Sequence, residues 1–132
     1  MKKDLSNIKK AKYLLDNNHC VAIPTETVYG LAANAYSDKA TSKIFKLKKR
    51  PKSNPLIVHY SRVQDLRKDC EINSNFQKLY SKFCPGPLTF VLKLKKESKI
   101  SKNVTNGKNT LAVRFPKNLV ARNLLSYLKY PL

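Results

Sequence analysis

The sequence predicts an α/β fold in which helices cover a sheet. Apolar segments of strand length alternate along the chain with segments in which apolar residues recur at helical spacing. The length of 132 residues favours one domain, residues 1–132, and a hydrophobic content of 42% is enough for a substantial core. We find no internal repeat, linker or low-complexity tract in the sequence.

Four segments are expected to be helices, because each combines a polar residue at its start with apolar residues on one face. They cover residues 6–17 and about 38–49, and two more begin at Ser74 and after Asn118; Ser6 and either Ser37 or Asp38 cap the first two. The apolar residues expected to point inward are Ile8, Ala11, Leu14, Leu15, Ala40, Ile44, Leu47, Phe76, Leu79, Tyr80, Phe83, Val120, Leu124 and Leu128.

Apolar runs between these helices predict strands. The runs are residues 20–23, 56–60, 88–94 and 111–115, and residues 28–35 are expected to be extended. The first run, 20–23, should be a buried strand. Pro24 should end or bend it, because proline has no N–H to donate to a neighbouring strand.

The segment after this strand concentrates polar groups in a few positions. Residues 24–34 read PTETVYGLAAN and include the hydroxyls of Thr25, Thr27 and Tyr29, the carboxylate of Glu26, and Gly30. Small polar groups just past a strand are well placed to line a pocket at a sheet edge. The same residues also suit an ordinary strand and turn, since Thr, Val and Tyr favour strands.

Three later motifs follow this one along the chain. They are KKRP (48–51) running into NPLIVH (54–59), then CPGPLT (84–89), then AVRFP (112–116). In this order the four motifs resemble the YrdC-like family, the threonylcarbamoyl-AMP synthases, over nearly the whole chain. The resemblance implies a mixed, twisted sheet with flanking helices and a basic groove. The family's further Ser-x-Asn motif does not occur after Arg114, so we expect a C-terminally truncated form of this domain.

The charge of the chain is strongly positive. The formal net charge is +19, from 27 Lys and Arg against 8 Asp and Glu. Such a charge attracts polyanions, among them nucleotides, nucleic acid and acidic membranes. A lysine-rich composition also arises from biased base composition in a genome, so charge alone does not identify a partner.

The cysteines and the N-terminus exclude several classes of protein. Cys20, Cys70 and Cys84 are odd in number and no pair has ligand spacing, which predicts neither a disulfide framework nor a zinc site. The basic residues at the N-terminus precede no long apolar stretch, so we expect neither a signal peptide nor a membrane span. A cytoplasmic protein without membrane contact is expected.

The low glycine content excludes glycine-rich phosphate loops. There are three glycines, and Lys102 stands where a Walker A loop before Gly107-Lys108 would need another. Phosphate must then be held by side-chain cations or helix N-termini. Residues 43–52 contain five lysines and one arginine. A solvated helix face explains such a run equally well.

The resemblance assigns roles to seven residues. Lys48 and Arg50 would hold the triphosphate and stabilise the leaving group, with Lys49 outward between them; Asn54 and Thr110 would contact the nucleotide; Thr25, His59 and Arg114 would bind threonine; no residue is expected to bind a metal. From the residues alone, His59 also fits a buried histidine with satisfied hydrogen bonds. An arginine in an apolar strand, such as Arg114, must reach an anion or the surface.

The reaction that the resemblance implies joins three anionic substrates. L-threonine, bicarbonate and ATP, with Mg²⁺, would give threonylcarbamoyl-AMP and pyrophosphate, and a partner protein would use the product to modify tRNA. The residues suit electrostatic chemistry of this kind. Glu26 is the only carboxylate inside a motif, which disfavours paired-carboxylate glycosidases and two-metal nucleases.

Two other functions stay open at this point. A basic RNA-binding module would bind mainly phosphate, because no RNP-type aromatic pattern is present. A non-catalytic fragment is the other possibility. The resemblance implies that the Ser-x-Asn motif, which does not occur after Arg114 in this sequence, closes over threonine and nucleotide. In that case turnover is lost, weak ATP binding survives through Lys48 and Arg50, and an exposed sheet edge favours self-association.

Overall fold

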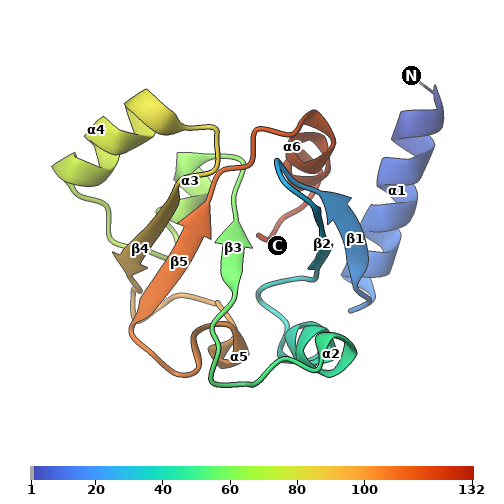
Figure 1. Cartoon of the computed structure of the whole chain (residues 1–132), viewed down its shortest axis with the longest axis horizontal. Coiled ribbons are helices and arrows are strands. Elements are labelled where there is room, and N and C mark those ends of the chain that lie inside the picture. The colour runs from blue at the N-terminus through green and yellow to red at the C-terminus, as the bar shows by residue number, and fades with distance from the viewer. Residues whose placement is uncertain (1) are drawn as a thin grey trace.

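Two small sheets, rather than one, form the middle of the protein (Figure 1). The computed structural model describes residues 2–132, with side chains from residue 4 onward. The strands are β1 (Val21–Pro24), β2 (Tyr29–Ala32), β3 (Ile57–His59), β4 (Thr89–Lys93) and β5 (Thr110–Arg114). β1 and β2 form an antiparallel hairpin, and the second sheet has the order β3-β5-β4.

The second sheet is mixed, because β3 lies parallel to β5 and β4 lies antiparallel to it. The predicted α/β class with a mixed sheet is therefore confirmed. The division into two sheets was not predicted, since hydrophobic periodicity does not show which strands pair.

Helices lie on the outer sides of the sheets (Figure 1). They are α1 (Lys2–Asp16), α2 (Asp38–Lys48), α3 (Val63–Leu66), α4 (Ser74–Phe83), α5 (Lys102–Thr105) and α6 (Leu119–Ser126). Ser37 caps α2 by accepting a hydrogen bond from the Ala40 amide at 3.0 Å, and Asn118 caps α6 in the same way. Both caps were predicted, as was the start of α4. α3 and α5, of four residues each, are too short to show a helical period.

Several predicted details are wrong. α1 begins at Lys2, so Ser6 lies inside the helix and does not cap it. The run 20–23 is not a buried strand: β1 belongs to a two-stranded hairpin, and of its residues only Ile23 is buried. Four residues predicted to point inward are substantially exposed; they are Leu47 (67%), Leu79 (44%), Phe83 (48%) and Val120 (55%). Leu47, Leu79 and Val120 lie at the edges of their helices' apolar faces, where periodicity does not separate buried from exposed positions, and Phe83 is the last residue of α4.

Each sheet has its own hydrophobic core. Around the three-stranded sheet, Phe76 of α4 packs on Phe90 of β4 with ring centroids 4.7 Å apart, and Tyr80 meets the Phe115 ring edge-on at 4.9 Å. Around the hairpin, apolar side chains of α1, α6 and β1 pack together, including the buried Leu15 and Leu124. Burial of these side chains supplies most of the folding energy.

The segment 130–132 connects the two halves. The Ala35 amide donates to the Pro131 carbonyl at 3.0 Å, while the His59 amide donates to the Leu132 carbonyl at 2.7 Å and the Leu132 amide returns a bond to His59 at 3.3 Å. The Tyr130 hydroxyl donates to Asp16 of α1 at 2.6 Å. The edge of β3 that does not face β5 is therefore paired at His59.

A buried carboxylate makes a further connection. Asp69 is 1% exposed and accepts hydrogen bonds from Tyr36 at 2.8 Å, Tyr60 at 2.7 Å and Ser98 at 2.8 Å. Burial, together with the neighbouring Asp69, raises the pKa of both tyrosine hydroxyls, which keeps them protonated as donors. Because buried charge is stable only when it is hydrogen-bonded, these three donors fix the loop before α2 against β3.

No helix within residues 2–132 combines the length and the apolar character needed to cross a membrane.

Gly86 lies where the chain leaves α4 and passes close to itself. Its amide donates to the Phe115 carbonyl at 2.9 Å, and an added Cβ would lie 2.7 Å from the Phe83 carbonyl oxygen. We expect Gly86→Ala to lower the free energy of unfolding by about 1–3 kcal/mol, since the clash is with backbone. Urea denaturation checks this. Gly30→Ala is the matched control, because its Cβ would meet Thr25 at an ordinary 3.7 Å; equal losses in both variants would contradict the prediction.

Candidate functional site

A pocket of about 490 Å³ lies between the hairpin and β3. Its lining is mainly apolar and comes from β1, β2, the segment after β2, α2, β3, α5 and Leu132. Thr25 and His59 both line it, so the structure brings together two residues that the sequence separates by 34 positions.

Thr25 closes the turn between β1 and β2. Its hydroxyl donates to the Val28 carbonyl and accepts from the Val28 amide at 3.2 Å, and its own amide also donates to the Val28 carbonyl, at 3.2 Å. Its methyl group faces Gly30, at ordinary contact distance from the place where a Cβ would lie. The hydroxyl of Thr25 thus shapes the wall of the pocket.

His59 presents an unsatisfied nitrogen at this pocket. Its Nε2 is buried and has no hydrogen-bond partner among the described residues. Burial, and to a smaller extent the Arg114 charge, lower the pKa of the imidazole to about 4, against the opposing effect of the Glu26 charge. The ring is therefore neutral at pH 7. The alternative of a fully satisfied buried histidine does not hold for this nitrogen, which leaves it free for a ligand.

Arg114 lies beside His59, because the two are directly opposite in the β3–β5 register. Its Nε and Nη2 donate to the Thr89 hydroxyl at 3.1 and 2.7 Å. This pair of bonds from the neighbouring β4 fixes the half-buried guanidinium. Its Nη1 makes no hydrogen bond to the described residues, so it can bind an anion. Thr89 thus holds the Arg114 side chain in place.

Lys48 and Arg50 do not line this pocket. α2 ends in a left-handed residue, Lys49 (φ 51°), and the amides of Lys49 and Arg50 bond back into the helix. Arg50 then donates from Nε to the Asn54 carbonyl at 3.1 Å and from Nη2 to the Pro55 carbonyl at 2.7 Å. Its guanidinium therefore shapes the loop that leads into β3.

The remaining predicted nucleotide contacts also lie apart from His59. Asn54 is exposed in the loop that Arg50 holds. Thr110 is exposed at the start of β5, opposite Lys93, whereas Arg114 ends that strand. At about 3.3 Å per residue, Thr110 and Arg114 are roughly 13 Å apart along the strand.

Glu26, which the sequence places in a motif, makes a long-range contact that the sequence did not predict. Its carboxylate accepts hydrogen bonds from the backbone amides of Lys117 and Asn118, across more than ninety residues of chain. These amides precede α6. A contact of this separation leaves no trace in local sequence patterns.

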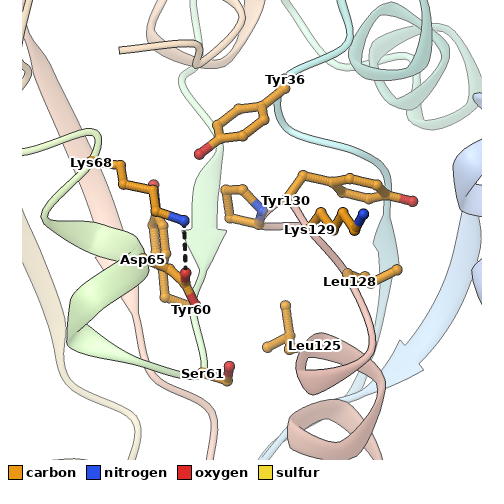
Figure 2. Close-up of a pocket in the computed structure, with 10 residues that line it drawn as sticks. Tyr36, Tyr60, Ser61, Asp65, Lys68, Leu125, Leu128, Lys129 and Tyr130 are labelled. Atoms are coloured by element: carbon orange, nitrogen blue, oxygen red, sulfur yellow. Dashed lines mark hydrogen bonds and ion pairs between the residues drawn. The ribbon is translucent and has the colours of Figure 1, made fainter. Parts of the chain in front are cut away.

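A second hollow, of about 310 Å³, lies beside the segment 128–131 (Figure 2). Its polar groups are largely satisfied. Tyr36 and Tyr60 donate to Asp69, and Asp65 pairs with Lys68 at 3.3 Å, as the dashed line in Figure 2 marks. Unlike the pocket at His59, this hollow offers no buried nitrogen or oxygen without a partner.

Residues 4–132 contain no group of three or more His, Cys, Asp or Glu side chains arranged to hold a metal ion. Cys20, Cys70 and Cys84 are free thiols.

Comparisons with known proteins agree with this geometry. The family model for Sua5, YciO and YrdC proteins, described as "Telomere recombination", matches residues 13–132. The threonylcarbamoyl-AMP synthase of Pyrococcus abyssi is 39% identical over 126 residues, which cover 95% of this chain and 36% of the relative. That of Bacillus subtilis is 42% identical over 121 residues, covering 89% and 34%.

A solved structure, P. abyssi Sua5 complexed with L-threonine, superposes with a TM-score of 0.88 at 38% identity. The superposition covers 94% of this chain and 36% of that one. The chain thus spans little more than a third of the length of these relatives.

The neutral His59 should make stability depend on pH. Because the pKa of His59 is about 4 in the folded protein and ordinarily 6.5, the unfolded chain binds more protons between these values. Stability should therefore fall as the pH is lowered from about 6.5 to 4, by an amount on the order of 1–3 kcal/mol. Urea unfolding across this range measures it. His59→Gln should flatten the profile; an unchanged slope in that variant would show that other groups cause the dependence.

Proposed function

The chain belongs to the Sua5/YciO/YrdC family, and on that premise we propose that it is an L-threonylcarbamoyladenylate synthase domain. The proposed reaction converts L-threonine, bicarbonate and ATP into threonylcarbamoyl-AMP and pyrophosphate. Two relatives with 39% and 42% identity bear the name of this enzyme, and the related P. abyssi Sua5 was solved with L-threonine.

The observation that carries the proposal is the buried, unpartnered Nε2 of His59, which lines the pocket, together with Arg114, which lies opposite His59 in the β3–β5 register although it does not itself line the pocket. A buried nitrogen without a partner costs about 1–3 kcal/mol, which a polar ligand would recover. An amino acid suits the two groups together. We propose that its carboxylate binds the free Nη1 of Arg114, while an amine or hydroxyl group bonds to His59 and Thr25 borders the pocket.

The nucleotide is proposed to bind through Lys48, Arg50, Asn54 and Thr110. Lys48 has no ion pair among the described residues, and Arg50 retains N–H groups beyond the two that hold its loop. Arg50 holds the Pro55 carbonyl, and the next residue, Leu56, lines the pocket. We propose that the two cations reach the triphosphate from this side of the pocket.

The proposed chemistry needs no side-chain nucleophile. The threonine amine and bicarbonate form a carbamate with release of water. A carbamate oxygen then attacks the α-phosphorus of ATP, the bond from this phosphorus to the bridging oxygen breaks, and pyrophosphate leaves. Lys48 and Arg50 stabilise the negative charge on the leaving group, and Arg114 and His59 orient the amino acid. Mg²⁺ would enter bound to the phosphates of ATP, because the described residues offer no carboxylate cluster for it.

The product is proposed to serve tRNA modification, through a partner protein that receives the reactive adenylate. A cytoplasmic location belongs to the same proposal, because ATP and tRNA meet there. Direct RNA contact is the second candidate function, supported by the net charge of +19.

Nucleotide binding should depend on two of three adjacent cations. Lys48→Ala and Arg50→Ala should each weaken ATP binding by about 1.5–3 kcal/mol, the usual worth of a charge-assisted hydrogen bond. Lys49→Ala is the matched control, because this left-handed residue is exposed and points away in our proposal. Calorimetric titration measures all three. Equal losses of ATP affinity in all three variants would contradict the prediction and would show only a basic surface, without a specific site.

Threonine binding tests the function at the other end of the pocket. We expect L-threonine to bind the wild-type chain, and Arg114→Ala to weaken it at least tenfold, because the carboxylate loses its cation. Arg114→Lys should recover little, since lysine cannot bond to Thr89 and the ligand in the same geometry. L-Valine, of similar shape but without the hydroxyl, is the ligand control. Failure of the wild type to bind threonine would overturn the proposed function.

A further inference from the structure

Glu26 forms a connection between two segments that carry the proposed threonine site. It lies in the turn between β1 and β2, next to Thr25. Its Oε1 accepts hydrogen bonds from the backbone amides of Lys117 and Asn118, the latter at 3.2 Å. These two residues follow Arg114 by only a short segment, Phe115-Pro116, which is buried. One carboxylate therefore joins the turn that carries Thr25 to the segment that follows Arg114.

The bonds to Glu26 complete the start of α6. Asn118 caps this helix with its own side chain, which accepts from the Val120 and Ala121 amides at 2.9 and 3.2 Å. The amides of Lys117 and Asn118 are not bonded by this side chain, and both donate to Glu26. Since the N-terminus of a helix carries partial positive charge, a carboxylate is favoured there.

The carboxylate is charged at neutral pH. Burial raises the pKa of Glu26, but hydrogen bonds from the Lys117, Glu26 and Asn118 amides lower it more, so that it lies below its usual value. The same charge acts on His59. Glu26 thus contributes both a geometric link and a negative charge close to the unpartnered imidazole.

The rest of the turn has no comparable support. Thr25 and Val28 bond to each other within the turn. Val28 and Tyr29 are 70% and 75% exposed. Among the described residues, Glu26 alone hydrogen-bonds this turn to a segment outside the hairpin. Without it, the turn would be held only by the short β1–β2 ladder.

We propose that Glu26 is a positioning residue that clasps the β1–β2 turn to the start of α6 and so holds Thr25 in register with His59 and Arg114. The inference rests on the proposed function for its ligand, threonine, and on the geometry alone for the clasp. Glu26 itself does not line the pocket, so its effect on binding passes through the residues that do.

The test compares three variants of the whole chain. Glu26→Ala removes the acceptor, and Glu26→Gln keeps an acceptor oxygen and the shape of the side chain but not its charge. Glu71→Ala is the control, because it removes an exposed carboxylate that pairs with Lys93 at 3.7 Å, on the other sheet. We expect L-threonine to bind Glu26→Ala about tenfold more weakly than wild type. Glu26→Gln should stay within about threefold, and Glu71→Ala should match wild type. ATP binding should be unchanged in all three.

Hydrogen exchange gives the second, ligand-free measurement. The amides of Lys117, Asn118 and residues 27–30 should exchange faster in Glu26→Ala, and at the wild-type rate in Glu71→Ala. Wild-type exchange rates at these amides in Glu26→Ala would overturn the clasp. Equal threonine affinity in wild type and Glu26→Ala would overturn the positioning role, as would a parallel loss of threonine and ATP binding. If the wild type bound no threonine, the proposed function would fail instead, and exchange would still decide the clasp.

Discussion

The backbone pairing between Leu132 and His59 is the constraint on which the candidate site depends. The two sheets share no strand, so the pocket between them exists only if something holds them in place. The segment 131–132 does this, by bonding to Ala35 on one side and by exchanging two backbone bonds with His59 on the other. Because β5 pairs with the opposite edge of β3, the backbone of His59 is held from both sides.

Two buried polar side chains, Asp69 and His59, differ in whether their hydrogen-bonding atoms have partners. Asp69, which is 1% exposed, accepts hydrogen bonds from three hydroxyl groups. The Nε2 of His59, in contrast, is the single buried side-chain nitrogen or oxygen among the described residues that has no partner. A folded chain keeps such an atom at a cost of about 1–3 kcal/mol. The unpartnered nitrogen lies at the pocket, and the neighbouring Arg114 is fixed by Thr89. Both observations favour a binding role for His59 over a structural one.

Local sequence signals predicted what is local in the structure. Ser37 and Asn118 cap their helices through contacts three residues away or nearer, and Pro24 ends β1 for lack of an N–H. Pairings between distant segments left no such signal. The division into two sheets, the Glu26 bonds to α6, and the three donors to Asp69 all depend on tertiary structure. The meeting of Thr25 with His59 was expected from the family resemblance, since periodicity alone places neither residue at a pocket.

Arg50 shows why the positive charges of this chain are not interchangeable. Of its N–H groups, those of Nε and Nη2 bond to the Asn54 and Pro55 carbonyls, so the guanidinium shapes the loop and still offers donors to an anion. A lysine could supply the charge but not both functions, because its ammonium is a single point. Lys49, with the same formal charge one position earlier, ends α2 in a left-handed conformation and has no part in the loop. The net charge of +19 therefore says less about binding than the placement of a few cations at the ends of α2 and β5.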